Sequence, residues 1–264
     1  MTKRAFIFTG QGEKLELTNP QLSTFWTSIS LAKILIANNI KPDALAGLSL
    51  GELSCYAIAN VFSVEELEAI IQYRQNAMDE ALSKSNTCML ACIGPSVNKI
   101  ETLIKNYDNI TITNYNSPTQ VVVGGGKEQI DAFKTDLLKL DKTTAVILPT
   151  IGAFHSAYLE QASEQLSVFL KPFEPKNPST PIYYNLTGNS NTPDIKDNLA
   201  KQVSNPVKFQ AIIENMLDDG INEFISIGIG TTPVNLIRQI CREKRAKATI
   251  KKVESLDDIK GLLV

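Results

Sequence analysis

The stretch DALAGLSLGELSCY, residues 43–56, holds the most specific pattern in this chain. Its first half is small and apolar and predicts a strand, and its second half predicts a helix. Ser49 lies between Gly47 and Gly51 at the junction, in the G-x-S-x-G pattern of a nucleophile on a tight strand-to-helix turn. Such a turn raises the hydroxyl clear of the sheet and leaves the next N–H group available to an oxyanion. The same residues also suit a glycine-marked turn in which the hydroxyl has no chemical role.

Strands and helices alternate on both sides of this stretch. Residues 4–9 predict a buried strand, residues 23–39 a helix, and residues 63–84 a helix that opens with a capping box of Ser63 and Glu66. The alternation predicts a parallel sheet with helices on its faces. The pattern resumes later in the chain, in segments that predict a helix, an extended piece, two helices and a strand: 156–171, 180–186, 195–203, 207–218 and 223–228.

A different order occupies residues 87–148, where the segments predict strand, helix, two strands, helix and strand. This succession is the ferredoxin-like order β-α-β-β-α-β. The predicted fold class is therefore α/β, with a hydrolase-like large subdomain built on a parallel sheet and an inserted, ferredoxin-like α+β small subdomain. We predict that residues 1–86 and 149–264 form the large subdomain and residues 87–148 the small one.

The composition excludes several classes of function. The 264 residues carry a net charge of −2 and have a pI near 5.6, which gives no electrostatic footprint for nucleic acid. No apolar segment has the length of a membrane span, and the apolar run after the first cations is too short for a secretion signal. We therefore expect a cytoplasmic, monomeric protein that binds neither nucleic acid nor membrane.

The four cysteines, at positions 55, 88, 92 and 241, do not have the spacing of a secreted disulfide framework. Cys88 and Cys92 lie four residues apart in an apolar stretch, and no histidine is near them in the sequence. This favours buried thiols over a metal site. The sequence predicts no metal and no cofactor.

The chain has one histidine, His155, in the segment GAFHSAYL. A serine nucleophile needs a base, so if Ser49 is a nucleophile, His155 is the base by elimination. A lone histidine is more often structural than catalytic, and this alternative stays open at the level of the residues. More than a hundred residues follow His155, whereas the α/β-hydrolases carry their histidine near the C-terminus. The order along the chain therefore fits an ordinary α/β-hydrolase poorly.

Eight short motifs follow one another along nearly the whole chain. They are FTGQG (8–12), TNPQL (18–22), GLSLGE (47–52), YRQNAM (73–78), NYNSPTQVVVGG (114–125), FHS (154–156), KQVSNPVKF (201–209) and SIGIGTTPVNL (226–236). Together they make the chain resemble the malonyl-CoA:acyl carrier protein transacylase family, which includes free-standing acyltransferases of the fatty-acid and trans-acyltransferase polyketide types. Only EKLEL (13–17) separates the first two motifs, so the N-terminal helical segment of that family is shortened here.

The resemblance implies a role for each matching residue. Ser49 would take the acyl group as an ester, and His155 would be its general base. Gln202 matches the position that orients the histidine. The backbone N–H groups of Gln11 and Leu50 would form the oxyanion hole.

Two further matches concern the acyl group. Arg74 would hold the malonyl carboxylate by a two-pronged, charge-assisted hydrogen bond that a lysine cannot reproduce. From the sequence alone, an exposed helix arginine is the favoured interpretation of Arg74, and the resemblance reverses it. Phe154 stands just before the histidine, where the related polyketide enzymes that select malonyl over methylmalonyl also carry phenylalanine.

The resemblance implies an enzyme that moves malonyl from coenzyme A to the phosphopantetheine thiol of an acyl carrier protein through a serine-linked acyl-enzyme. The expected partners are malonyl-CoA and the carrier protein, and coenzyme A enters as part of a substrate. One alternative is an acyl-carrier-protein hydrolase that uses the same serine and histidine. Another, from a different class, is a non-catalytic subunit that docks carrier protein.

Overall fold

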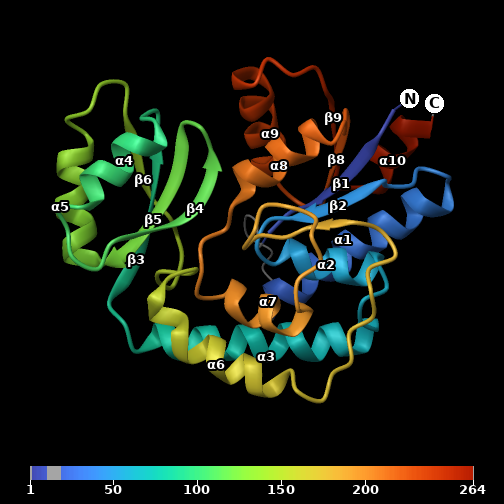
Figure 1. Ribbon diagram of the computed structural model, residues 1–264, viewed down its shortest axis with the longest axis horizontal. Coiled ribbons are helices and arrows are strands. Elements are labelled where there is room, and N and C mark those ends of the chain that lie inside the picture. Colours follow the sequence, from blue (N-terminus) through green and yellow to red (C-terminus); the bar gives the residue numbers. More distant parts are fainter. Residues whose placement is uncertain (1, 11–18, 264) are drawn as a thin grey trace. The chain divides into compact units, whose positions relative to one another are not determined.

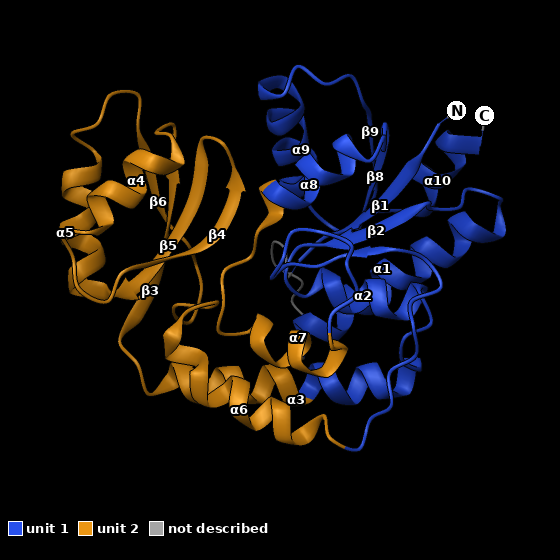
Figure 2. Cartoon of the chain, viewed as in Figure 1, with its two compact units in different colours: residues 1–72, 172–193, 211–264 blue, residues 73–171, 194–210 orange. Residues whose placement is uncertain are grey.

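The computed structural model describes residues 2–10 and 19–263. The chain divides into two compact units, coloured separately in Figure 2. The first unit comprises residues 1–72, 172–193 and 211–264, and the second comprises residues 73–171 and 194–210.

The first unit is built on a parallel sheet, which has five strands among the described residues. In spatial order the strands are β7 (Ile182–Tyr183), β2 (Ala44–Gly47), β1 (Arg4–Phe8), β8 (Glu223–Ile227) and β9 (Thr249–Val253). Each neighbouring pair runs parallel. The helices of this unit are α1 (Pro20–Ala37), α2 (Gly51–Ile58), the N-terminal part of α3 (Val64–Ser83), most of α8 (Phe209–Asp218), α9 (Thr232–Glu243) and α10 (Leu256–Leu263).

Helices cover both faces of the parallel sheet. Figure 1 shows α1 and α2 on one side of the strands, and α8 and α9 on the other. Strands β2 and β8, on either side of the central strand β1, are buried at every residue. Burial on both faces explains why these segments are almost continuously apolar, as in the run FISI of β8. The carboxyl ends of the parallel strands are where the connections to α2 and α9 begin, and such ends are the usual place for a site.

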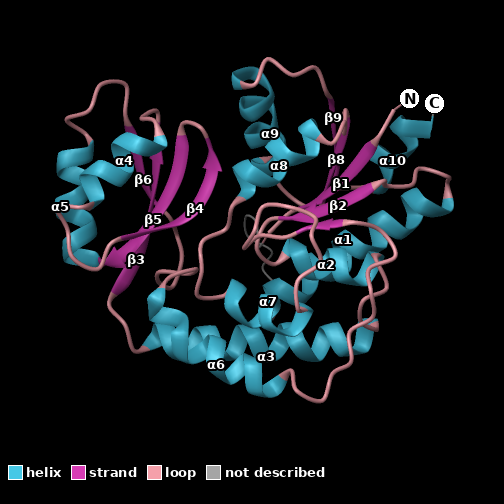
Figure 3. Ribbon diagram, viewed as in Figure 1, coloured by secondary structure: helices cyan, strands magenta, loops and turns pink. Residues whose placement is uncertain are grey.

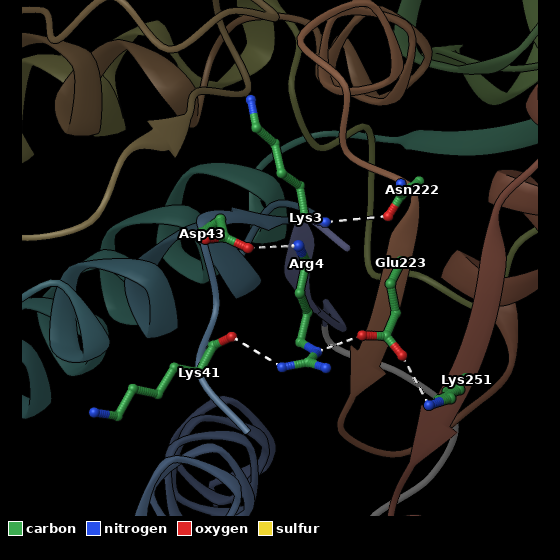
Figure 4. A network of polar contacts seen from close by, with 7 residues as sticks. All are labelled: Lys3, Arg4, Lys41, Asp43, Asn222, Glu223 and Lys251. Carbon is green, nitrogen blue, oxygen red and sulfur yellow. Dashed lines mark hydrogen bonds and ion pairs between the residues drawn. The ribbon is translucent and has the colours of Figure 1, made fainter. Parts of the chain in front are cut away.

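The amino ends of β1 and β8 are joined by a network of charged groups (Figure 4). Glu223 accepts from Arg4 Nε at 2.5 Å and from Lys251 Nζ at 2.7 Å. The backbone N–H of Arg4 donates to Asp43 at 2.7 Å. Burial acts to raise the pKa of Glu223, but the hydrogen bonds with Lys251 and Arg4 outweigh it and hold the pKa below its ordinary value. This network fixes the register of the strands at the end opposite to Ser49.

The second unit contains an antiparallel sheet with the spatial order β4-β5-β3-β6. Figure 3 shows its strands and helices. In chain order the elements are β3 (Thr87–Ile93), α4 (Val97–Ile104), β4 (Thr111–Ser117), β5 (Gln120–Gly126), α5 (Lys127–Leu137) and β6 (Thr144–Ile147). One face of this sheet forms an apolar core with the two helices, in which Ile100 of α4 and Phe133 of α5 are fully buried. The β-α-β-β-α-β order predicted for this segment is confirmed.

The second unit extends beyond the predicted segment 87–148. It also holds the C-terminal part of α3 (Val64–Ser83), α6 (Glu160–Phe169) and α7 (Ile195–Gln202). Backbone hydrogen bonds explain the addition, because Tyr115 of β4 donates to Val207 at 2.8 Å and Val207 donates to Thr113 at 2.9 Å. A compact unit therefore includes segments that are remote in the sequence.

Local signals in the sequence explain several helix boundaries. The capping box at α3 is confirmed, because Ser63 N donates to Glu66 at 2.7 Å and Glu66 N donates to Ser63 at 3.1 Å. Helix α1 begins three residues before the predicted start at 23, because Asn19 caps it through a bond from Leu22 N and Pro20 suits its first turn. Within the extended piece predicted at 180–186, only the two residues of β7 form a strand.

Candidate active site

The turn between β2 and α2 has the geometry of a nucleophile elbow. Ser49 has a φ of +54°, in the left-handed region that a residue with a side chain rarely adopts. A Cβ at Gly47 would lie 2.0 Å from the carbonyl carbon of Gly51, and one at Gly51 would lie 2.4 Å from Phe8 O. Both glycines are therefore required by the close approach of backbone to backbone. The predicted strand, turn and helix around Ser49 are confirmed.

Leu50 precedes the first residue of α2 and serves as its N-cap. The first N–H groups of a helix lack partners within the helix and carry a partial positive charge. The N–H of Leu50 therefore stands in a position that suits a developing negative charge. Gln11, the other residue assigned to the oxyanion hole, lies outside the described residues.

His155 is buried in the second unit, just before the short 3-10 helix Ala157–Leu159 and α6. Like Ser49, it has a left-handed backbone, with a φ of +57°. Its backbone N–H donates to Val203 O at 3.1 Å, and its ring Nδ1 lies 2.8 Å from Gln202 O. Because a carbonyl oxygen can only accept, Nδ1 carries the proton and donates it. In the neutral ring, Nε2 then carries the lone pair that a general base needs.

The surroundings of His155 keep its ring neutral. Burial, and then the positive charge of Arg74, lower its pKa to about 4, against opposing hydrogen bonds with the backbone of Gln202 and Asn205. At neutral pH the ring is therefore unprotonated and ready to accept a proton.

Gln202 joins the histidine to the arginine. Its backbone carbonyl holds His155 Nδ1, while its side-chain Oε1 accepts from Arg74 Nη2 at 3.1 Å. The side chain is therefore bonded to the arginine, and it is the main chain that orients the imidazole. Arg74 itself is only 2% exposed, so the alternative of an exposed helix arginine is wrong.

Phe154 packs on the face of the antiparallel sheet opposite to α4 and α5. It contacts the cluster of Met89, Ala91 and Val122, and it stays partly exposed. Its neighbour Ala153 is fixed by a hydrogen bond from its N–H to Thr87 Oγ1 at 3.0 Å.

The second unit thus brings together Arg74, His155 and Gln202, and the first unit holds Ser49 and Leu50. The four cysteines are buried and free, as predicted, and burial raises the pKa of Cys92 to about 12. Across residues 2–10 and 19–263, histidine, cysteine, aspartate and glutamate form no group that could hold a metal ion. In the same part of the chain, no helix has both the length and the apolar character to cross a membrane.

The model of the acyl transferase domain family matches residues 5–257. Malonyl CoA-acyl carrier protein transacylase from Staphylococcus aureus (strain MSSA476) is 31% identical over 264 residues, which cover 97% of this chain and 83% of the relative. This chain belongs to the acyl transferase family of the malonyl CoA-acyl carrier protein transacylases. The motifs that suggested the resemblance therefore reflect common descent.

Solved structures have the same fold as this acyl transferase. MCAT from Streptococcus pneumoniae aligns with a TM-score of 0.90 at 26% identity and covers 99% of both chains. A type II PKS acyl-carrier protein in complex with its malonyl-transacylase provides a second match, with a TM-score of 0.88 at 22% identity and 99% coverage of both chains.

Two residues of this acyl transferase that sequence analysis left without a role contact the elbow or brace it. Asn185, two residues after β7, accepts from Ser49 N at 2.9 Å and donates to Gly47 O at 2.8 Å. Glu52, the last residue of the motif GLSLGE, accepts from Asn185 Nδ2 at 2.6 Å. The only sequence signal was an asparagine that follows a short extended segment and a glutamate in the first turn of a helix.

Proposed function

We propose that this acyltransferase moves malonyl from coenzyme A to the phosphopantetheine thiol of an acyl carrier protein. Malonyl is proposed as the acyl group because the guanidinium of Arg74 is buried. Arg74 is hydrogen-bonded to Gln202, which also holds His155. A charged acyl group needs a buried, oriented cation, and a carboxylate takes two parallel hydrogen bonds from arginine. The curated relative and the solved carrier-protein complex support the same substrate and partner.

The proposed reaction has two halves. The hydroxyl of Ser49 gives its proton to His155 Nε2 and its oxygen attacks the thioester carbonyl, and the N–H group of Leu50 stabilises the resulting oxyanion. The carbon–sulfur bond then breaks, the proton passes to the leaving sulfur, and coenzyme A departs. In the second half the carrier thiol gives its proton to His155, attacks the serine ester and releases Ser49 as a hydroxyl. All steps use side chains and backbone of this chain, with coenzyme A as part of the substrate.

We also propose that the first unit is a hydrolase-like subdomain and that the antiparallel part of the second unit is a ferredoxin-like one. The parallel sheet of the first unit with its serine elbow supports a hydrolase-like subdomain. The order β4-β5-β3-β6 of the antiparallel sheet supports a ferredoxin-like one.

Radiolabelled malonyl-CoA tests the proposed function. The protein is incubated with it in the presence and in the absence of holo acyl carrier protein, and the label is followed into protein, carrier and free acid. We expect the label to stay on the protein when the carrier protein is absent, and to move to the carrier protein when it is present. Label that appears mainly as free malonate would instead support a hydrolase, and the lack of any labelled protein would contradict acyl transfer.

Replacing Arg74 with alanine should change the acyl group that the enzyme accepts. Removing one partner of a buried charge pair leaves the other charge unpaired, so malonyl transfer should fall at least about 10²-fold, while acetyl transfer is kept or gained. Arg74→Lys should recover little, because an ammonium cannot make the two-pronged contact. Initial rates with malonyl-CoA and acetyl-CoA measure the ratio, and Arg242→Ala on an exposed face of α9 is the control. An equal fall with both thioesters would show that Arg74 only supports the fold.

Replacing Phe154 with serine should relax selection at the α-carbon. Wild-type protein should prefer malonyl-CoA to methylmalonyl-CoA, because a ring beside the base fills the space that a methyl branch needs, at a cost of about 1–3 kcal/mol. The packing of Phe154 on Met89 and Val122 holds the ring in place for this role. The ratio of kcat/KM values for the two thioesters is the measurement. Equal wild-type values would contradict the role of the ring.

A further inference from the structure

We propose that Asn185 is a positioning residue that holds the Ser49 elbow in its reactive conformation. The proposal rests on the proposed role of Ser49 as the nucleophile. All the contacts that carry it lie in the first unit.

The sheet topology brings Asn185 to the elbow. Strand β7 pairs in parallel with β2, with Leu45 opposite Ile182 and Ala46 opposite Tyr183. Neighbouring parallel strands end at the same edge of a sheet, so the residues that follow β7 meet those that follow β2. Asn185 therefore reaches the turn from Gly47 to Ser49.

The side-chain amide of Asn185 bonds to the turn after β2 as a backbone peptide group of a longer β7 would. Its Oδ1 accepts from the N–H of Ser49 at 2.9 Å, and its Nδ2 donates to the carbonyl of Gly47 at 2.8 Å. One planar amide thus pairs with a backbone donor and a backbone acceptor on the two sides of Leu48. Strand β7 ends after two residues, so its own backbone does not continue the ladder this far.

Glu52 fixes which way the amide faces. Its Oε2 accepts from Asn185 N at 2.7 Å and from Asn185 Nδ2 at 2.6 Å, and its Oε1 accepts from the hydroxyl of Tyr56 at 2.8 Å. Because Oε2 accepts, it faces the NH₂ group of the amide, and Oδ1 is left to accept from the N–H of Ser49. Glu52, Tyr56 and Asn185 are all fully buried, so water does not compete for these contacts.

The elbow needs such a brace because its backbone is strained. A left-handed residue with a side chain persists only where the surroundings impose it. Ser49 is such a residue, and Asn185 holds the N–H of Ser49 and the carbonyl of Gly47 on either side of the bend. A relaxed turn would displace the hydroxyl and the N–H of Leu50, and a shift of about 1 Å can cost about 10²-fold in rate.

Single-turnover acylation separates positioning from folding. Wild-type protein, Asn185→Ala and Asn215→Ala are mixed with excess malonyl-CoA and quenched, and intact-protein mass spectrometry follows the acyl-enzyme. The final amplitude reports the folded fraction, and the maximal rate constant reports the geometry of the elbow. Asn215 is the matched control, because its Nδ2 donates to Gly188 O at 2.8 Å, in the same loop but away from the elbow.

We expect Asn185→Ala to lower the maximal rate constant by about 10²-fold while Asn215→Ala changes it less than about threefold. The concentration of malonyl-CoA at half the maximal rate should change less than about threefold in both variants. Asn185→Asp keeps the size of the side chain and the acceptor for Ser49, and it should also be slow, because it places an oxygen against Gly47 O. If Asn185→Ala fails to fold, Asn185→Asp provides the same test.

Two results overturn the proposal in different ways. A lower amplitude with a wild-type rate constant in Asn185→Ala, or in Asn185→Asp, would show that Asn185 only stabilises the fold. If wild-type protein itself forms no acyl-enzyme, the proposed function fails and the role of Asn185 fails with it.

Discussion

Replacing Ser49 with alanine is expected to abolish the acyl-enzyme that wild-type protein forms with malonyl-CoA. Ser49 is the serine of the G-x-S-x-G turn, in a strained conformation that the two glycines make possible. A methyl group has no lone pair to attack the thioester and cannot hold an ester, so the loss should be complete. Mass spectrometry of the intact protein after incubation is the measurement, because it detects the covalent acyl group directly.

Ser54→Ala is the matched control for this experiment. Ser54 is a buried serine of α2, the helix that begins just after the elbow. We expect this variant to be acylated at about the wild-type level, whereas the Ser49 variant gives unmodified protein. A retained acyl group in Ser49→Ala would show that another side chain is the nucleophile.

Replacing His155 with alanine should slow acylation by about 10²–10⁴-fold, the usual effect of losing a general base. Its Nδ1 is committed to the carbonyl of Gln202, so the proton of Ser49 would be taken by Nε2. The fold should survive, as circular dichroism would show, because the variant removes a buried group whose backbone contact with Val203 remains. Near-wild-type rates in a folded variant would show that His155 is structural.

The low pKa of His155 also determines how the acylation rate depends on pH. The base must be neutral to accept a proton, and burial with the charge of Arg74 lowers its pKa to about 4. The acylation rate should therefore be flat from pH 8 to about pH 5 and should fall as the pH passes through 4. A fall centred near pH 6.5 would mean that the ring titrates as it does in water.

The free energy of unfolding should also depend on the protonation of His155. The pKa of His155 is about 4 in the folded protein, and in the unfolded chain it takes its ordinary value of 6.5. Between pH 4 and pH 6.5 the unfolded chain therefore binds more protons than the folded protein. Stability should therefore fall as the pH drops from 6.5 to 4, by about 3 kcal/mol from this residue alone. This part of the loss should be absent from His155→Ala.

Much of the fold could be predicted because its signals are local. The apolar runs of β1 and β8, the glycine turn at Ser49 and the capping box at Ser63 each specify an element from neighbouring residues. No residue ranges could be predicted for the elements after residue 230, which are α9, β9 and α10. Strand β9 explains why, because Lys251 and Lys252 interrupt its apolar pattern, and Lys251 is satisfied by Glu223 from a neighbouring strand.

The site could be predicted only where it follows a motif. Ser49, His155 and Arg74 stand in motifs of the family, but the role of Asn185 depends on the pairing of β7 with β2, across more than a hundred residues of sequence. The resemblance already placed Gln202 beside His155, but residue types do not show that the backbone carbonyl of Gln202, and not its side chain, holds the ring. Contacts that depend on topology or on the main chain are not visible in residue types.

The central claim, a malonyl ester on Ser49 that passes to a carrier protein, has one direct test. Wild-type protein is incubated with malonyl-CoA, and half of the sample is then given holo acyl carrier protein before both halves are digested and mapped by tandem mass spectrometry. We predict that malonyl lies on Ser49 in the first half, and that in the second half it has left Ser49 for the phosphopantetheine thiol. Malonyl on any other residue, or a Ser49 ester that the carrier protein does not discharge, would contradict the account.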